Sequence, residues 1–356
     1  MLEHLCLQVT LQYNVHAFSI ISENFVPVIM PAGKALCTSL LRCFPEDMSL
    51  AFAYGSAVFQ QSGYSRTASK MVDFVFVVDN PYEWHRKNLG MNKNHYSFLK
   101  YLGAHRVSTI QNRIGAGVYY NTLVKCDDVL IKYGIINTKT LQEDLLEWKS
   151  MYIAGRLHKP VMILKQKASK LLEYSLKSNL EHAVNVSLLL LPETFTEEQL
   201  YITIAGLSYA GDFRMTVGED KNKVSNIVKP NLAHFQELYS PILKSMEYVQ
   251  WNRESMTMQQ DRSPSNLLSL MFNLPKHLQT TILKNVSNRN EDMEEIFQKL
   301  TYSGLTKQAV QDGIQSIVSS SSWSQSLKAI LMAGIFKSVR YGSQKLKKMM
   351  KGGRMK

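Results

Sequence analysis

"AFAYGSAVFQQSGYSRTASKMVDFVFVV", residues 51–78, contains two apolar runs typical of buried strands, separated by a polar stretch. The first run ends at Gly55 and Ser56, and the second opens with Asp73. Because glycine lacks a Cβ, the backbone of a Gly-Ser turn can approach a phosphate closely. A carboxylate on the neighbouring strand can then hold Mg²⁺, which bridges carboxylates to substrate phosphates. The pattern predicts a nucleotidyltransferase-type site; an ordinary turn beside a strand-capping aspartate is the alternative.

A second carboxylate is usual in such a site, but the sequence does not place one at the expected position. Side chains at i and i+2 of a strand share a face, yet the residue two positions after Asp73 is Val75. Asp79 shares the face but lies about 20 Å along the strand, at ~3.3 Å per residue. Asp212 is the best remaining candidate. Arg214 follows it closely, so the two residues could act as a metal ligand and a phosphate contact, or form a structural ion pair.

The composition is that of a globular protein that can bury a core, with 45% hydrophobic and 20% charged residues in a chain of 356. There are 41 basic and 29 acidic residues, and residues 337–356 hold eight basic residues and no acidic one. A basic tail on a nearly neutral body indicates a polyanionic partner, either nucleic acid or anionic lipid. The four cysteines lack CxxC spacing, which argues against a zinc site. No run approaches the ~18 apolar residues of a membrane span.

The chain divides into an α/β half and a mostly helical half. Residues 35–168 carry the strand-like runs and are predicted to form an α/β (α+β) nucleotidyltransferase-fold domain. Strand signals then fade and helical spacing dominates, so 169–318 is predicted to be a helical domain with a linker near 254–265. Residues 319–356 are predicted to form a basic amphipathic C-terminal segment, and residues 1–34 stay unassigned.

Two local patterns lie close to the predicted site. The apolar runs 117–124 and 129–136 flank the turn composition of residues 125–128, which predicts a β-hairpin. Residues 140–157 have helical periodicity, and Thr140 with Glu143 fits a capping box at the start of that helix.

Several motifs are long enough to be specific, and they follow one another from about residue 35 to the C-terminus. They include YGSAVFQQSG (54–63), VDFVFVVDNPYEWHRKN (72–88), AGLSYAGDFRMTVGEDKNKVSNIV (205–228) and VRYGSQKLKKMMKG (339–352). Together they resemble the mitochondrial CDP-diacylglycerol synthases, also called translocator assembly and maintenance proteins. The resemblance implies a nucleotidyltransferase domain followed by a winged-helix-like domain. It also implies conversion of CTP and phosphatidic acid into CDP-diacylglycerol and pyrophosphate with Mg²⁺, on the matrix side of the mitochondrial inner membrane, ahead of cardiolipin synthesis.

The resemblance also implies roles for individual residues. Gly55 and Ser56 would cradle the CTP phosphates, Asp73 would hold Mg²⁺, and Asp212 would complete the acidic, catalytic pair. The cations expected at the phosphates are Lys132, Arg156, Lys159 and Arg214. Each has a structural alternative. Lys132 alternates within a strand and could be solvated, whereas Arg156 and Lys159 close a helix, where cations suit the helix dipole.

The C-terminal segment has the composition of an interfacial helix. Apolar residues recur at helical spacing from Trp323 through Leu327 and beyond. The residues predicted to bind the membrane are Lys337, Arg340, Lys345, Leu346, Lys347, Lys348, Met349, Met350 and Lys351. Such a helix inserts its apolar stripe at the acyl boundary while Lys and Arg meet anionic headgroups, so a peripheral contact with the anionic inner membrane is expected. Alternatively, residues 323–340 pack on the body of the protein.

Two other functions stay open on the sequence. A nucleotidyltransferase that acts on RNA or another acceptor would use the basic tail on nucleic acid. Stacking on single strands needs interleaved aromatic residues, and the tail has only Tyr341, so no nucleic-acid partner is expected. A non-catalytic membrane factor that supports protein import would not need an intact site, whereas Gly55, Ser56 and Asp73 are all present.

Overall fold

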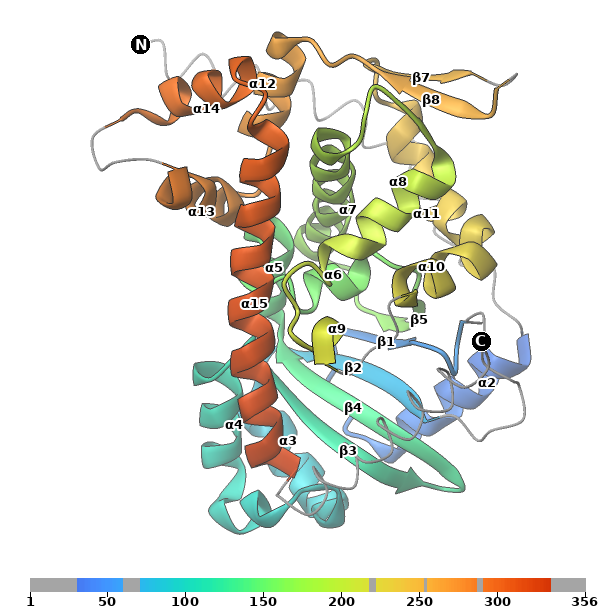
Figure 1. Ribbon diagram of the computed structural model, residues 1–356. Helices are drawn as coiled ribbons and strands as arrows, with labels where there is room; N and C mark the ends of the chain where they lie inside the picture. Colours follow the sequence, from blue (N-terminus) through green and yellow to red (C-terminus); the bar gives the residue numbers. More distant parts are fainter. Residues whose placement is uncertain (1–30, 60–70, 218–221, 253–254, 287–290, 334–356) are drawn as a thin grey trace.

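The computed structural model describes residues 31–59, 71–217, 222–252, 255–286 and 291–333. The chain forms a mixed α/β structure in which a five-stranded sheet lies beside a group of helices, and one long helix runs along both (Figure 1). No helix in these ranges is both long enough and apolar enough to cross a lipid bilayer. The residues predicted to bind the membrane, Lys337 to Lys351, lie outside the described residues.

The five-stranded sheet has the strand order β3-β4-β2-β1-β5. Its members are β1 (Leu50–Tyr54), β2 (Val72–Val78), β3 (Val118–Cys126), β4 (Val129–Asn137) and β5 (Met162–Gln166). The two apolar runs of residues 51–78 are adjacent strands, because β2 pairs antiparallel with β1 and parallel with β4. The predicted hairpin is confirmed, since β3 and β4 pair antiparallel.

The two faces of the sheet have different neighbours. Phe76 of β2 packs against Trp84 of α3, with ring centroids 6.0 Å apart. Because side chains alternate along a strand, Asp73 points to the opposite face, together with its cross-strand partner Tyr54. The helices of this half are α2 (Pro31–Leu40), η2 (Leu41–Cys43), α3 (Pro81–Met91), η3 (Lys93–His95), η4 (Phe98–Leu102), α4 (Gly103–Arg113), α5 (Thr138–Glu147) and α6 (Ala154–Leu157).

The single helix predicted over residues 140–157 is in fact two helices, α5 and α6. The side chain of Asn137 accepts hydrogen bonds from the N–H groups of Lys139 and Thr140, so Asn137 is the N-cap of α5 and the predicted capping box at Thr140 is wrong. Trp148 ends α5 in the left-handed region, at φ +58°. The chain then turns through a short loop before α6 begins.

The second half is mainly helical but contains strands that the sequence does not predict. Its helices are α7 (Lys170–Leu190), α8 (Glu197–Leu207), α9 (Arg214–Val217), α10 (Lys223–Val228), η5 (Lys229–Asn231), α11 (Leu232–Lys244), α12 (Pro264–Phe272), α13 (Lys276–Val286), α14 (Met293–Tyr302) and α15 (Thr306–Ala333). A small sheet of order β6-β8-β7 is formed by β6 (Thr194–Thr196), β7 (Val249–Asn252) and β8 (Thr257–Gln260). Strands this short lack a recognisable alternation, and β8 occupies part of the predicted linker.

Helix α15 joins the two halves. In Figure 1 it runs from the group of α13 and α14 down to β3 and α4. Near its end, the side chains of Gln325 and Lys328 hydrogen-bond to backbone groups within residues 111–118. The serines of residues 319–322 lie inside this helix, so the predicted boundary between residues 318 and 319 falls within a continuous element.

Candidate active site

The Gly-Ser turn lies directly beside Asp73. Gly55 has φ +85°, a conformation that side-chain-bearing residues rarely adopt, and a Cβ there would lie 3.2 Å from Asp73 Oδ2. The Gly55 carbonyl accepts hydrogen bonds from the N–H groups of Val58 and Phe59, which closes the turn. The positive φ therefore favours glycine, and a Cβ here would also crowd the Asp73 carboxylate. The predicted neighbours Gly55 and Asp73 are brought together.

Lys132 pairs with Asp73 across two strands. The two residues are cross-strand neighbours on β4 and β2, with Lys132 Nζ 3.8 Å from Asp73 Oδ1. The ammonium also lies over the ring of Tyr120, 4.5 Å from its centroid. The side chains of Lys132 and Asp73 are 19% and 24% exposed, so both remain open to a ligand. Lys132 is therefore not simply a solvated side chain on a strand, which was the alternative considered from the sequence.

Arg156 lies on the same face of the sheet, next to the turn. Its guanidinium carbon is 4.2 Å from the centroid of the Tyr54 ring, and Tyr54 immediately precedes Gly55. Its Nε is buried, and among the described residues it has no hydrogen-bond partner. A guanidinium held by an aromatic ring and not by a carboxylate keeps its charge available, which favours an anion beside it.

The loop that positions Arg156 is organised by the buried carboxylate of Asp144. Its Oδ1 accepts from the N–H groups of Ser150 and Met151, at 2.8 and 2.9 Å. Its Oδ2 accepts from the N–H groups of Ile153 and Ala154, at 3.2 and 3.0 Å. One side chain thereby satisfies backbone donors at the start of α6, and the direction of this short helix follows from it.

Lys159 follows α6 and is buried. Its Nζ donates to the carbonyl oxygens of Gly155 and Ala205, at 2.5 and 3.4 Å, and to Ser208 Oγ at 2.8 Å. Burial, and then the nearby charges of Arg156 and Lys223, lower the pKa of Lys159 well below the ordinary lysine value. These contacts join α6 to α8 and support the structural role considered for Lys159, while its place beside a cavity keeps a phosphate contact open.

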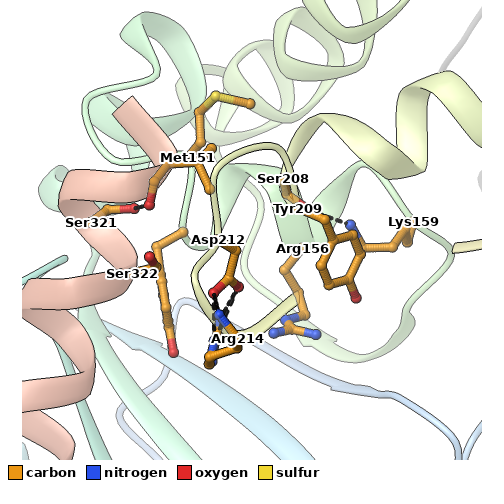
Figure 2. A pocket seen from close by; sticks show the side chains of 11 residues that line it. Met151, Arg156, Lys159, Ser208, Tyr209, Asp212, Arg214, Ser321 and Ser322 are labelled. Atoms are coloured by element: carbon orange, nitrogen blue, oxygen red, sulfur yellow. Dashed lines mark hydrogen bonds and ion pairs between the residues drawn. The ribbon is translucent and has the colours of Figure 1, made fainter. Parts of the chain in front are cut away.

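The cavity lies where α6, the loop after α8 and α15 meet (Figure 2). Its volume is about 40 Å³. The lining residues are Met151, Tyr152, Arg156, Lys159, Ser208, Tyr209, Asp212, Arg214, Val318, Ser321 and Ser322. Two arginines, the buried amine of Lys159 and one carboxylate thus face a small space that both halves of the chain build.

Asp212 and Arg214 form a tight ion pair in this cavity. Arg214 Nε donates to Asp212 Oδ1 at 2.9 Å and Nη2 donates to Oδ2 at 2.6 Å. The Asp212 side chain is 3% exposed and that of Arg214 is 38% exposed, so the guanidinium reaches solvent while the carboxylate does not. This geometry satisfies the ion-pair alternative. A role for Asp212 as a metal ligand stays a prediction.

The predicted residues therefore fall into two adjoining groups. Gly55, Asp73 and Lys132 meet at the turn, with Ser56 next to Gly55 in the chain. Arg156, Lys159, Asp212 and Arg214 line the cavity. Among the described residues, the only three His, Cys, Asp or Glu side chains whose ligand atoms lie within 4.8 Å of one another are Cys43, Cys126 and Asp127. That cluster does not include Asp73.

Several residues of the site were not predicted from the sequence. Tyr54 and Tyr120 supply the rings beneath Arg156 and Lys132, and Ser321 and Ser322 come from a helix far along the chain. The sequence could have pointed to Tyr54, because it immediately precedes the Gly-Ser turn. Nothing in the local sequence pointed to Ser321 and Ser322, since the packing of α15 brings them to the cavity.

The fold and this site define an α/β protein with a carboxylate and several cations beside a Gly-Ser turn, an arrangement suited to a phosphate-bearing ligand. Comparison with known families is more specific. Residues 37–348 match the family described as "Phosphatidate cytidylyltransferase, mitochondrial". The chain therefore belongs to this family, which covers the α/β half and the helical half together.

Individual relatives carry the same name. A protein of that name from Xenopus laevis is 50% identical over 330 residues, which is 92% of this chain and 97% of the relative. The protein from Danio rerio is 50% identical over 321 residues, 89% and 95% of the two chains. The protein from Schizosaccharomyces pombe is 39% identical over 333 residues, 88% and 84% of the two chains.

Proposed function

We propose that this protein is a mitochondrial phosphatidate cytidylyltransferase, which joins the cytidylyl group of CTP to phosphatidic acid and releases pyrophosphate. The observation that carries the proposal is the convergence of Gly55, Asp73 and Lys132 at one turn, in a chain similar over most of its length to proteins of that name. The product, CDP-diacylglycerol, would feed cardiolipin synthesis.

Mg²⁺ fits the residues at the turn. The Asp73 carboxylate is 24% exposed, so it is open to a hydrated ion, and Mg²⁺ usually binds through one or two carboxylates, substrate phosphates and water. Asp73 would hold the ion, and Asp212 is the candidate for a second carboxylate once Arg214 pairs with a phosphate. Bound Mg²⁺ would offset the charge of the triphosphate and of the leaving pyrophosphate.

The chain's own residues would bind and align the two phosphates. The Gly55-Ser56 turn would present backbone N–H groups to the triphosphate, and Lys132 and Arg156 would neutralise it from either side. A phosphate oxygen of phosphatidic acid forms a bond to the α-phosphorus, the α–β bridging bond breaks, and pyrophosphate leaves with the electron pair. The attacking oxygen needs no general base, because the second pKa of a phosphate monoester is about 6.

The test is product formation by purified protein with labelled CTP, Mg²⁺ and vesicles that contain phosphatidic acid. We expect a labelled lipid product, and none when phosphatidylcholine replaces phosphatidic acid. RNA is offered in a parallel reaction, because a nucleotidyltransferase acting on RNA was the main alternative. Labelled RNA without labelled lipid would overturn the proposed acceptor.

We also propose peripheral attachment to the matrix side of the inner membrane through residues 337–351. Each basic residue near an anionic surface contributes on the order of 1 kcal/mol, so partial engagement would be enough. Removal of residues 341–356 should reduce flotation with cardiolipin vesicles at low salt and leave CTP binding intact. Equal flotation of the full and shortened chains would contradict this attachment.

The helical half is proposed to be winged-helix-like. The three-stranded sheet β6-β8-β7 beside α8 and α11 supports this, because a small antiparallel sheet packed on helices is the makeup of a winged helix. In the proposed enzyme this half supplies Ser208, Tyr209, Asp212 and Arg214 to the cavity.

A further inference from the structure

Helix α15 exposes two large apolar side chains close to the cavity. Ser321 and Ser322 of this helix line the cavity, and the next residue, Trp323, is 53% exposed. Leu327 is 65% exposed and lies one turn further on, on the same side of the helix. The neighbouring positions Gln325 and Lys328 are buried against residues 111–118. The helix therefore packs on the protein with one face and presents Trp323 and Leu327 with another.

A stacked aromatic pair joins this apolar surface to the cavity. The Phe213 and Trp323 rings lie 4.1 Å apart at an angle of 18°, and Phe213 stands between Asp212 and Arg214, which both line the cavity. Gly211 lets this loop approach α15, because a Cβ at that position would lie 2.7 Å from the Gln315 carbonyl oxygen. Phe213, Trp323 and Leu327 together are called the apolar ridge below.

We infer that the cavity binds the phosphate of the lipid acceptor and that the apolar ridge binds the first part of its acyl chains. The inference rests on the proposed function and adds where the second substrate lies. Single exposed apolar residues are common, but here they adjoin a cavity lined by Arg156 and by Arg214, whose guanidinium reaches solvent. The phosphate and acyl chains of a phospholipid match this arrangement. The guanidinium groups in the cavity would bind the phosphate, and the apolar ridge would contact the acyl chains.

The position of the cavity agrees with this division of the two substrates, because one shared side chain links it to the Gly-Ser turn proposed for CTP. Arg156 lines the cavity and also contacts Tyr54 next to the Gly-Ser turn. One guanidinium therefore stands between the proposed acceptor phosphate and the CTP phosphates, where it reduces their repulsion as the attacking oxygen approaches the α-phosphorus.

The variants Trp323→Ala and Leu327→Ser test the ridge. With phosphatidic acid in detergent micelles, each should raise the KM for phosphatidic acid by about tenfold or more, the change that ~1.4 kcal/mol brings, with an unchanged KM for CTP. The defect should shrink for a short-chain phosphatidic acid, which has little hydrocarbon to place on the ridge. Tyr302→Ala and Leu305→Ser are matched controls, because Tyr302 and Leu305 are 75% and 55% exposed and precede the cavity-lining part of α15.

Binding of micellar phosphatidic acid, measured without CTP, separates this inference from the proposed function. Weaker binding by Trp323→Ala but not by Tyr302→Ala supports the ridge even if no CDP-diacylglycerol forms. Trp323→Phe keeps an aromatic ring and should restore binding. Equal KM values for phosphatidic acid in the ridge variants and controls, or equal increases in the KM for CTP, would overturn the inference.

Discussion

Replacement of Arg156 by methionine should separate catalysis from stability. The side chain contributes a cation–π contact with Tyr54, worth about 1–2 kcal/mol when partly desolvated. Against this, its Nε is buried without a hydrogen-bond partner among the described residues, and leaving such a donor unsatisfied costs about 1–3 kcal/mol. Because these terms oppose each other and methionine can keep the ring contact, the free energy of unfolding should change by no more than about 1 kcal/mol.

Activity should respond very differently. If Arg156 meets phosphates at both subsites, its removal takes away a charge aimed at the reacting groups, and losses of about 10²–10³ in kcat are typical of such groups. The assay is turnover of CTP with phosphatidic acid vesicles, together with chemical denaturation of the same preparations. Activity within about tenfold of wild type, a barrier change of ~1.4 kcal/mol, would refute the reasoning.

Arg262 offers the matched control. Its Nη1 donates to the carbonyl oxygens of Leu188 and Leu191 at the end of α7, whereas the buried Nε of Arg156 has no hydrogen-bond partner among the described residues. Arg262→Met should lower the free energy of unfolding by about 1–3 kcal/mol and leave turnover of the folded protein nearly unchanged. If Arg156→Met instead loses as much stability as Arg262→Met, Arg156 is a structural residue.

Three further predictions concern single side chains. Asp73→Asn keeps the shape but removes the charge, so turnover should fall by several orders of magnitude with an unchanged thermal midpoint; a fall of less than about tenfold would remove Asp73 from the proposed metal site. Asp212→Ala should raise the Mg²⁺ concentration needed for half-maximal rate, and an unchanged requirement would leave Asp212 as the partner of Arg214. Burial lowers the pKa of Lys328 from 10.5 to about 7. Between these two pH values Lys328 carries a proton in the unfolded chain but not in the folded one. The free energy of unfolding therefore rises with pH, by up to ~1.4 kcal/mol per pH unit. Chemical denaturation at pH 7 to 9 should show that the free energy of unfolding rises less steeply with pH in Lys328→Met than in the wild type. Equal slopes for the two proteins would contradict this.

The parts of the fold that follow local patterns could be predicted from the sequence. The strands β1 and β2 are continuous apolar runs, and their pairing places Asp73 opposite Tyr54 next to the Gly-Ser turn. The hairpin of β3 and β4 follows from two apolar runs around a turn composition. In each case the signal lies within about 30 residues and reflects burial of one strand against its neighbour.

Other features depend on contacts between distant segments and gave no local signal. Arg156 reaches the ring of Tyr54 because Asp144 ends the helical pattern and redirects the chain into α6. The periodicity of residues 140–157 hides this break, since a carboxylate that binds four backbone N–H groups looks in sequence like any polar helix position. The cavity likewise exists only because α15 packs across both halves.

The most direct test of the proposed reaction follows the α-phosphorus and the γ-phosphorus of CTP separately. Purified protein is incubated with Mg²⁺, phosphatidic acid vesicles and CTP labelled at either the α- or the γ-phosphorus. The proposed reaction predicts α-label in the lipid, γ-label in pyrophosphate, equal amounts of the two products, and neither product with Asp73→Asn. Transfer of γ-label to the lipid, or no labelled lipid from protein shown to bind CTP, would contradict it.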